Sequence, residues 1–461
     1  MLPTQINMNT QTNALHKLLR FLKATGIIAA MIAMMLIILT LVANAQDRTI
    51  TLDEAIKLGL QNSKTLKMSQ SKIDQAVSEY NQAKDKALPT GNASFAYNRA
   101  QIPAHTLDFG AGDPIHLPSS ANAYLGIASV NETIWAGNRL RYARESTDLL
   151  VQVAKLDADK DKDEISYDVI NAYYGLYKVL QSKKVVEANL KTIDAQIKQA
   201  NRFFEQGLVT KNDVLRFQLQ RSNIELNGID LESNRKIINY NLDVLLGLPE
   251  TTQLNIAQIT EANKPLAPLS TYIDTAMANR QEFKQFDLRT QAAETNIKSI
   301  RANQSPTLAA SLGGYYVDVS GNPIPQSGKF ITPITAGLTL SWNFGSLWTN
   351  KNKVAEARIE RDQTVIGKDI ALDNIKNEVN RNYQNYMMAV NKINLLQTSI
   401  AQAGENNKIL ESKYQSNVAS ATDRADAETL LYQAQINLEL ARADAGLAYY
   451  TLLKSTGKLI K

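Results

Sequence analysis

The chain carries one sequence pattern twice, and this duplication constrains its fold more than any other feature. Residues 52–97 align without gaps with residues 269–314 at an offset of 217, and residues 165–247 align with residues 375–457 at an offset of 210. Both blocks occur in the same order in each half. This order indicates one supersecondary unit used twice.

A proline-containing connector separates the two halves. Residues 249–268 hold three of the 12 prolines of the chain, which marks this stretch as a turn or loop by composition. We therefore expect a first structural repeat at 46–260 and a second at 261–461. In each repeat, we expect helices, then a β-hairpin, then a long helical hairpin.

Long helices are expected because breakers are scarce. The chain has only 21 Gly and 12 Pro in 461 residues, and no proline occurs within 119–248 or 334–461. Proline disrupts helix interiors, so these stretches accommodate long helices. Apolar residues in them recur at alternating steps of four and three, the seam of a coiled coil. The pattern predicts long helical hairpins at 138–247 and 347–456, with helices of about 100 Å at 1.5 Å per residue.

Four segments have the alternating character of β-strands. Pro89 and Pro306 end a helix predicted over 52–88 and its counterpart, and mixed small, aromatic and polar residues follow. We predict two hairpins, about 91–135 and 307–345, with strands at 91–101, 121–135, 307–320 and 331–345. Segments of this length suit tilted strands that cross a membrane.

Four membrane strands cannot close a barrel alone. The smallest membrane barrels have about eight strands, and an open sheet edge in lipid leaves N–H and C=O groups unpaired. We therefore predict an α+β membrane protein, mainly long helices, whose strands complete a barrel by oligomerisation. Three copies give 12 strands, but the sequence alone does not choose three over two or four.

The first 45 residues have the pattern of a signal peptide. Three basic residues precede an apolar run at 26–42 that ends in Ala43-Asn44-Ala45, a small-x-small cleavage site. The alternative is an uncleaved membrane anchor. Without these residues the positive and negative charges nearly balance, so charge gives no support for nucleic-acid binding. The absence of cysteine excludes disulfides, thiol catalysis and Cys-based zinc sites.

The two predicted helical turns share a motif. It runs from Phe204 through Gly207-Leu208-Val209-Thr210 to Asp213, and it is echoed from Tyr414 through Asn417-Val418-Ala419-Ser420 to Asp426. This motif resembles that of the outer-membrane efflux protein family, the TolC-like export ducts. The resemblance implies a homotrimer with a 12-stranded barrel in the outer-membrane lipid and an α-helical tunnel in the periplasm of a Gram-negative bacterium. It also implies a passive duct for tripartite efflux or type I secretion, working with a periplasmic adaptor and an inner-membrane pump of the RND or ABC type, without enzymatic activity or cofactor.

Asp423 and Asp426 are candidates for the periplasmic entrance. They are three residues apart and so share one helix face. The resemblance implies that such acids ring the narrow entrance, where three copies place six carboxylates that favour cations. Helix capping by Ser420 and Asp423 is the alternative explanation, and Thr210 with Asp213 repeats that pattern.

Three further residues are candidate contacts that hold the entrance closed. The resemblance implies hydrogen bonds between neighbouring helix pairs through Tyr414 and Asp213. Ala419 stands where the family has a cationic partner, so Arg424 is the candidate substitute. The alternative for Tyr414 is an ordinary aromatic residue of the coiled-coil seam.

Both turns are candidate docking sites for the adaptor. Glycine permits the positive φ at a helix C-terminus, and an apolar residue after it offers an exposed contact. Asparagine can also take the left-handed conformation, so Asn417-Val418-Ala419-Ser420 is a second candidate dock. Gly207 simply ending its helix is the alternative. The candidate docking residues are Gly207, Leu208, Val209, Thr210, Asn417, Val418 and Ser420.

The tryptophans and histidines are the remaining candidates. Trp135, Trp342 and Trp348 lie where predicted strands meet long helices, so we predict an aromatic belt at the membrane interface, with packing at the junction as the alternative. His105 and His116 share one predicted external loop, but their spacing with nearby acids is irregular, so we predict no metal site. No nucleophile motif or phosphate loop stands out.

Two other classes of protein compete with an export duct. An inner-membrane-anchored periplasmic coiled-coil protein explains the long helices but gives the duplicated hairpins no purpose. A periplasmic adaptor would need one helical hairpin flanked by β-rich domains, and this chain has two. The exported substrate is unreadable from the sequence.

Overall fold

The structure is a computed structural model that describes residues 48–101, 106–107, 110, 112–116, 120–257, 265–320 and 331–459. The predicted signal peptide, the loop at 321–330 and His105 lie outside the described residues. The chain divides into two compact units. The described residues of unit 1 fall in Met1–Ser63, Ile165–Leu266 and Tyr383–Leu452, and those of unit 2 fall in Lys64–Glu164, Ala267–Asn382 and Leu453–Lys461.

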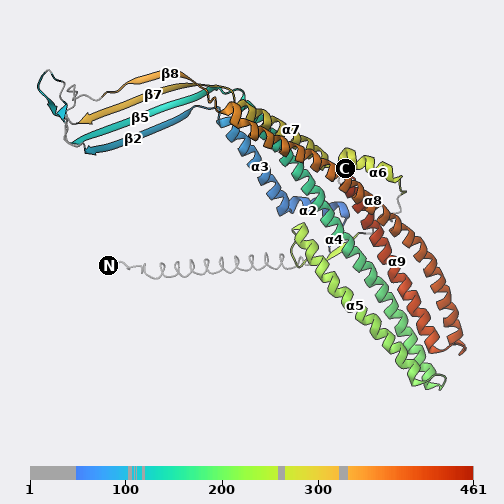
Figure 1. Ribbon diagram of the computed structural model, residues 1–461. Coiled ribbons are helices and arrows are strands. Elements are labelled where there is room, and N and C mark those ends of the chain that lie inside the picture. The colour runs from blue at the N-terminus through green and yellow to red at the C-terminus, as the bar shows by residue number, and fades with distance from the viewer. Residues whose placement is uncertain are drawn as a thin grey trace, which may run out of the picture. The chain divides into compact units, whose positions relative to one another are not determined.

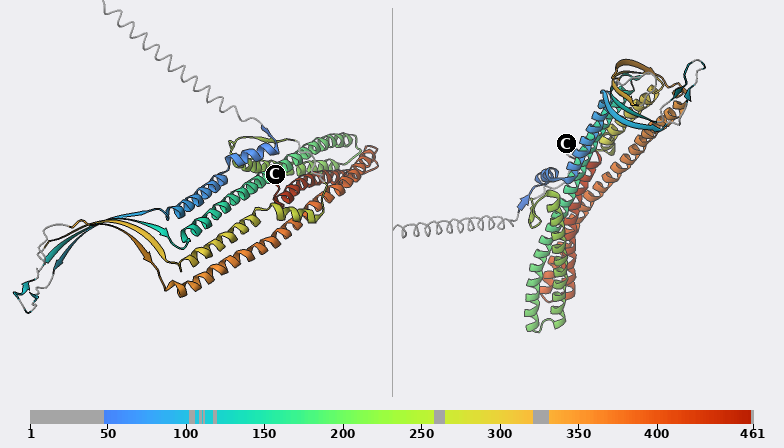
Figure 2. Two further views of the ribbon diagram at one scale, coloured as in Figure 1. Left: turned by 90° about the horizontal axis from the view of Figure 1, so that it is seen from above. Right: turned by 90° about the vertical axis from the view of Figure 1, so that its left-hand side faces the viewer.

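Unit 2 contains a four-stranded antiparallel sheet, which forms one curved layer in Figure 2. Its order is β2 (Thr90–Gln101), β5 (Ser120–Trp135), β7 (Thr307–Ser320) and β8 (Ile334–Ser341). The prediction of four strands is confirmed. The last strand is shorter than the predicted 331–345: it starts after Pro333, which has no N–H for the ladder, and it ends at Ser341, before the turn that precedes α8. Ile331 keeps only an isolated bridge to Val317.

The register gives the two faces of this sheet different chemistry. Val130 pairs with Leu312, Leu312 pairs with Ala336, and side chains alternate between faces along each strand. One face carries most of the exposed large apolar and aromatic residues, including Phe95, Tyr97, Val130, Leu312, Leu338 and Leu340. The opposite face carries mainly small and polar residues toward the helices, including Asn92, Ser94, Ser129, Ser311, Thr335 and Thr339, and it carries Leu125, Ile127, Tyr315 and Val317 farther from them.

The shorter helices break at equivalent places in the two halves. The sequence predicted one helix over 52–88, but the structure has α2 (Leu52–Asn62) and α3 (Lys64–Asp85) separated by Ser63, whose ψ is 121°. In the second half, α6 (Leu269–Asn279) and α7 (Gln281–Ala302) are separated by Arg280, whose ψ is 128°. The offset between these two extended residues is the offset of the first aligned block of the duplication.

The long helices are α4 (Arg139–Glu205), α5 (Lys211–Leu246), α8 (Ser346–Gln415) and α9 (Ala421–Ser455), and the prediction of long helices is confirmed. In unit 1 they lie side by side in the order α5, α4, α9, α8 (Figure 1). Lys183 of α4 pairs with Glu232 of α5 at 2.9 Å, and Asn189 of α4 donates to Gln435 of α9 at 3.1 Å. The apolar core near the turns contains Ile193, Ala200, Phe217, Ile224, Tyr414 and Ala425.

Two small strand pairs were not predicted. β1 (Arg48–Ile50) pairs in parallel with β6 (Leu254–Ile256) in unit 1. Such short strands carry too little alternation to be recognised in a sequence. β3 (Thr106–Leu107) pairs with β4 (Ile115–His116) inside the segment predicted as an external loop. Among the described residues, no helix is both long enough and apolar enough to cross a membrane.

Candidate functional site

Both long helical hairpins turn through the same backbone motif. The N–H of Gly207 donates to the carbonyl of Phe204 at 2.9 Å, and the N–H of Leu208 donates to Phe203 at 2.8 Å. Gly207 has φ +74°, the left-handed conformation that this C-terminal motif requires. A Cβ at Gly207 would touch nothing within 4 Å, so the backbone conformation and not space favours glycine there.

Asn417 occupies the equivalent position in the second turn. Its φ is +59°, its N–H donates to Tyr414 at 3.1 Å, and the N–H of Val418 donates to Lys413 at 2.8 Å. Asparagine tolerates this conformation better than most residues with a side chain. The two turns lie at the same end of unit 1 in Figure 1.

Each turn exposes one apolar side chain. Leu208 is 50% exposed and Val418 is 74% exposed, whereas Val209 and Ala419 are half-buried. The exposed side chains directly follow the left-handed residues, at equivalent positions of the two repeats. Leu208 and Val418 therefore provide two similar exposed apolar contacts for a partner protein.

The helices that leave the turns begin with reciprocal caps. The carboxylate of Asp213 accepts from the N–H of Thr210 at 2.8 Å, and that of Asp423 accepts from the N–H and hydroxyl of Ser420 at 3.1 and 2.7 Å. The N–H of Asp423 donates back to the Ser420 hydroxyl at 3.1 Å. Hydrogen bonds from Ser420 lower the pKa of Asp423, so this exposed carboxyl stays charged. Capping thus explains the identity of Asp213 and of Asp423.

Asp426 has no such local explanation. It is exposed, like Asp423, whereas Arg424, Ala425 and Glu428 of the same helix are buried. The two aspartates therefore lie together on the exposed side of α9. Within the described part of the chain, Asp426 makes no hydrogen bond or ion pair.

Tyr414 lies in the core between the helices. It is 3% exposed, and its ring centroid is 5.8 Å from those of Phe203 and Phe217. Its hydroxyl has no hydrogen-bond partner among the described residues. Burial and then the charge of Asp213 raise the pKa of Tyr414, while Arg424 opposes them. The structure thus brings Tyr414, Asp213 and Arg424 close together without a hydrogen bond from Tyr414.

Arg424 is engaged inside the chain. Its side chain is 4% exposed, and it donates to Asn407 of α8 and to Glu428 at 3.2 Å. Glu428 is equally buried and accepts from Gln196 of α4 at 3.1 Å. This network joins α4, α8 and α9. Its only signal in the sequence is an Arg and a Glu four residues apart, and such a pair does not by itself distinguish a buried ion pair from a solvated one.

The three tryptophans are exposed and lie in unit 2 near the junctions between strands and helices. Trp135 ends β5, and Trp348 is in the first turn of α8. The indole N–H of Trp342 donates to the carbonyl of Gln304 at 2.9 Å, and its ring centroid lies 4.4 Å from that of Phe344, with the two rings tilted by 53°. Trp342 therefore makes packing contacts as well as having an exposed surface.

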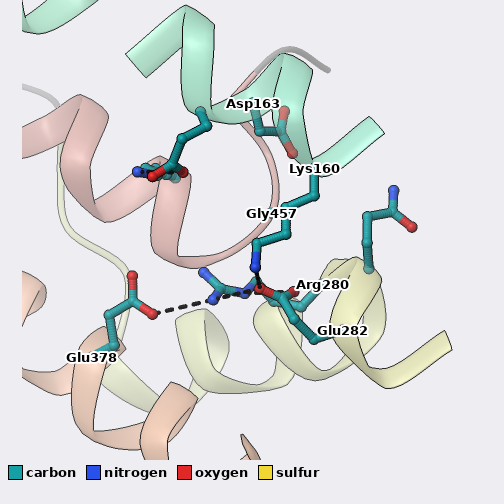
Figure 3. A pocket seen from close by; sticks show the side chains of 9 residues that line it. Lys160, Asp163, Arg280, Glu282, Glu378 and Gly457 are labelled. Carbon is teal, nitrogen blue, oxygen red and sulfur yellow. Dashed lines mark hydrogen bonds and ion pairs between the residues drawn. The ribbon is translucent and has the colours of Figure 1, made fainter. Parts of the chain in front are cut away.

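Unit 2 also holds a charged cavity of about 230 Å³ (Figure 3). Arg280 pairs with Glu282 at 3.0 Å and with Glu378 at 3.2 Å, and Lys160 lies 3.9 Å from Glu282. Gly457 has the left-handed conformation and lies close to Arg280. A Cβ added to Gly457 would lie 3.1 Å from the backbone nitrogen of Arg280. These cations are engaged with carboxylates, so the cavity is a structural ion-pair network at the break between α6 and α7.

Comparison with known proteins identifies the chain. The model of the family described as outer membrane efflux protein matches residues 55–248 and 272–458, so each half contains one copy. The outer membrane efflux protein BepC of Brucella suis biovar 1 (strain 1330) is 22% identical over 344 residues, covering 72% of this chain and 71% of BepC.

Solved structures share the fold. CusC has a TM-score of 0.73 at 15% identity, covering 88% of this chain and 92% of CusC. VceC of Vibrio cholerae has a TM-score of 0.69 at 17% identity, covering 88% of this chain and 96% of VceC. The family match decides against the anchored coiled-coil alternative. The chain belongs to the outer membrane efflux protein family and is an outer-membrane efflux channel of the TolC-like fold, a transport duct with a helical tunnel in the periplasm and not an enzyme.

Proposed function

We propose that three copies of this chain form the passive exit duct of a tripartite efflux or type I secretion system. The observation that carries the proposal is the incomplete sheet. β2 and β8 are its edges, and neither has a further strand beside it among the described residues. Open edges are not tolerated in lipid, so strands of other copies must pair with them. Three copies supply 12 strands, within the range of outer-membrane barrels.

The faces of the sheet support the orientation of this barrel. The face with Phe95, Leu312 and Leu338 meets the outer-membrane lipid, and the face with Ser311 and Thr339 lines the lumen. Trp135, Trp342 and Trp348 form an aromatic belt at the periplasmic interface. The mature chain begins after a signal peptide at 1–45, and its repeats occupy 46–260 and 261–461.

The turns are the docking end of the duct. Gly207, Leu208, Val209 and Thr210, with Asn417, Val418 and Ser420 in the second turn, contact a periplasmic adaptor that links the duct to an inner-membrane pump of the RND or ABC type. The exposed Leu208 and Val418 support this assignment.

The entrance lies at the same end. Asp423 and Asp426 of three copies form a ring of six carboxylates that selects cations, and Tyr414, Asp213 and Arg424 hold the entrance closed. The exposed position of both aspartates and the proximity of the other three residues support these roles.

Membrane fractionation tests the proposal. The protein should appear in the outer-membrane fraction as a trimer that migrates intact on an unheated detergent gel and as a monomer after heating. Its intact mass should correspond to a chain starting near Gln46. Extraction with inner-membrane proteins, or a monomer in both gel lanes, would refute it.

A further inference from the structure

The helices of unit 2 carry a strongly basic band where they end next to the strands. The band consists of four ten-residue segments at the strand-proximal ends of α3, α4, α7 and α8, namely 79–88, 136–145, 296–305 and 345–354. These segments contain nine lysines and arginines but only three acidic residues, Glu79, Asp85 and Glu145. Each copy of the chain therefore has a net charge of +6 in the band.

This excess of positive charge is local. The rest of the chain after residue 45 has 38 basic and 42 acidic residues. The next ten residues of the same helices, 69–78, 146–155, 286–295 and 355–364, hold five basic and seven acidic residues. The sign of the charge thus reverses beyond a band that is about 15 Å tall at 1.5 Å rise per residue.

The cations of the band are available to an outside partner. All nine side chains are exposed, and none makes an ion pair within the described part of the chain. Arg139 donates to the neutral amide oxygen of Asn303 at 3.1 Å. Just beyond the band, by contrast, Arg361 lies 3.7 Å from Glu294 and Arg289 lies 3.8 Å from Asp157.

The band directly follows the apolar face of the sheet. At the helical end of the strands this face ends with Leu308 and Leu340, and Trp135 is paired with Leu308. Figure 2 shows α3, α4, α7 and α8 ending side by side next to the sheet. In the proposed orientation of the barrel, the band is therefore level with the periplasmic surface of the outer membrane.

The first turn of α8 places a basic residue on the same side as an interface aromatic. Trp348 is 68% exposed, and Lys351 follows it by three residues, so both share one helix face. On α4, Arg141 and Arg144 are also three residues apart and share a face. A lysine one turn below an interfacial tryptophan reaches the depth of lipid headgroups.

Other copies of the chain cannot neutralise the band. Every added copy brings the same excess of nine cations over three acids, so assembly concentrates the positive charge. Phosphate groups of anionic lipids are fixed at the depth of the band, and clusters of lysine and arginine beside a membrane attract such lipids. Guanidinium and ammonium groups also form strong hydrogen bonds to phosphate oxygens.

We propose that the basic band binds the headgroups of anionic phospholipids in the leaflet of the outer membrane that faces the periplasm. This inference rests on the proposed barrel and its orientation, and it adds a lipid partner to the duct. The charge complementarity and the continuity of the band with the apolar face of the sheet favour a lipid as the occupant. Several such lipids bind around each copy, since the cations are spread over four helices.

The tryptophans of the chain provide a test without any added label. The chain has only three, at 135, 342 and 348, and all lie at the edge of the band. The purified full-chain trimer is reconstituted in phosphatidylcholine vesicles that contain the same mole fraction of brominated phosphatidylglycerol or of brominated phosphatidylcholine. Bromine quenches nearby indole fluorescence. We expect about twofold or more stronger quenching by the anionic lipid, and a ratio near one in about 1 M salt, where the Debye length is about 3 Å.

A quadruple variant removes the cations nearest the tryptophans. Its exposed residues are replaced by glutamine, which keeps the length of the side chains and leaves the core untouched, and the trimer band on an unheated gel checks its assembly. We expect the quenching ratio to fall to about one, because the charge that attracts the lipid is reduced. The substitutions are Arg141→Gln, Arg144→Gln, Lys351→Gln and Lys353→Gln.

The matched control removes the same number of positive charges far from the band. Its four lysines are exposed, lie in unit 1 and make no ion pair with a described residue. We expect this control to keep the ratio of the parent protein. The substitutions are Lys191→Gln, Lys198→Gln, Lys236→Gln and Lys408→Gln.

The outcomes separate this inference from the proposed function. Equal quenching by both lipids in the parent protein would overturn lipid binding by the band but would leave the barrel in place, because the tryptophans still meet acyl chains. No quenching by either lipid in an assembled trimer would refute the lipid-facing belt and with it the proposed orientation. An unchanged ratio in the quadruple variant would overturn the proposal, and a simultaneous change of ion selectivity in planar bilayers would assign these cations to the lumen. Equal loss of the ratio in both variants would reduce the effect to overall charge and would also overturn it.

Discussion

At the scale of single residues, the two exposed aspartates of α9 allow a helix-capping role to be distinguished from an electrostatic role in ion selectivity. Asp423 caps the helix and Asp426 does not, yet both lie on the exposed side. We expect Asp423→Asn with Asp426→Asn to weaken cation preference and sensitivity to polyvalent cations in planar bilayers, because asparagine also caps well but carries no charge. Unchanged ion selectivity in the folded double variant would leave capping as the explanation.

Gly446 allows the packing around Tyr174 to be tested by the addition of a single methyl group. A Cβ at this position would overlap the ring of Tyr174, which is buried among other tyrosines. We expect Gly446→Ala to lower the free energy of unfolding by about 1–3 kcal/mol through overpacking. Gly404 is the control, since a Cβ there meets nothing within 4 Å and alanine should stabilise its helix by about 0.5–1 kcal/mol. Urea unfolding should therefore give opposite signs, and equal signs would contradict the local geometry.

Asp243 makes the stability of unit 1 depend on pH. Its side chain is fully buried, one oxygen accepts from Asn239 at 2.8 Å, and the other has no partner among the described residues. Burial raises the pKa of Asp243 from 3.8 to about 6. The folded state therefore binds the proton more tightly than the unfolded state, and this contribution to stability is lost as the pH rises from about 4 through 6.

Asp243→Asn removes that dependence while keeping an acceptor for Asn239. We expect the variant to be more stable at pH 8 by up to about 3 kcal/mol, and to resemble the parent protein near pH 4. Thermal unfolding across this pH range provides the measurement. An unchanged slope between pH 4 and 7 would show that another group titrates.

At the scale of elements, the turn between α4 and α5 is the sharpest test of docking. We expect Leu208→Glu to leave folding and trimer formation intact but to abolish export, because a charge replaces an exposed apolar side chain that is not part of the apolar core near the turns. Gln206→Glu is the matched control, which adds the same charge two residues away and should retain export. Normal export by a correctly assembled Leu208→Glu trimer would refute the docking role.

The elements show how far the sequence was sufficient. The long helices were predictable because proline is absent and apolar steps persist over many turns, and the strands because their alternation follows Pro89 and Pro306. Helix breaks at Ser63 and Arg280 were not, since neither residue is a strong breaker and the extended ψ there depends on tertiary packing.

The sequence predicted those parts of the candidate site whose interactions involve residues close together in the chain. Capping and the turns follow from short motifs that involve neighbours in sequence. The role of Arg424 could not be predicted in this way. Its partners are Asn407 and Glu428, and Glu428 also accepts from Gln196, so the network forms only when three helices pack together. Removing one member of such a buried charge pair leaves the other charge uncompensated. The sequence does not show that the pair is buried, because its burial depends on how the helices pack.

At the scale of the whole molecule, the two faces of the sheet must meet different surroundings for the duct to assemble. Leu338 and Thr339 are neighbours in β8, yet Leu338 lies on the apolar face and Thr339 on the polar face. Both are exposed in the single chain, so neither substitution removes a core contact. The pair therefore compares a position on the proposed lipid face with one on the proposed lumen face without a change of strand.

We expect Leu338→Lys to reduce the outer-membrane trimer several-fold and Thr339→Lys to leave it nearly unchanged. A lysine on the lipid face of a membrane strand costs about 2–4 kcal/mol near the bilayer midplane, and assembly repeats this cost in every copy, whereas a lysine in an aqueous lumen stays hydrated. The measurement is the heat-modifiable trimer band in the outer-membrane fraction, compared at equal total protein. If Thr339→Lys were the damaging change, the faces would be reversed, and the apolar side would point into the channel.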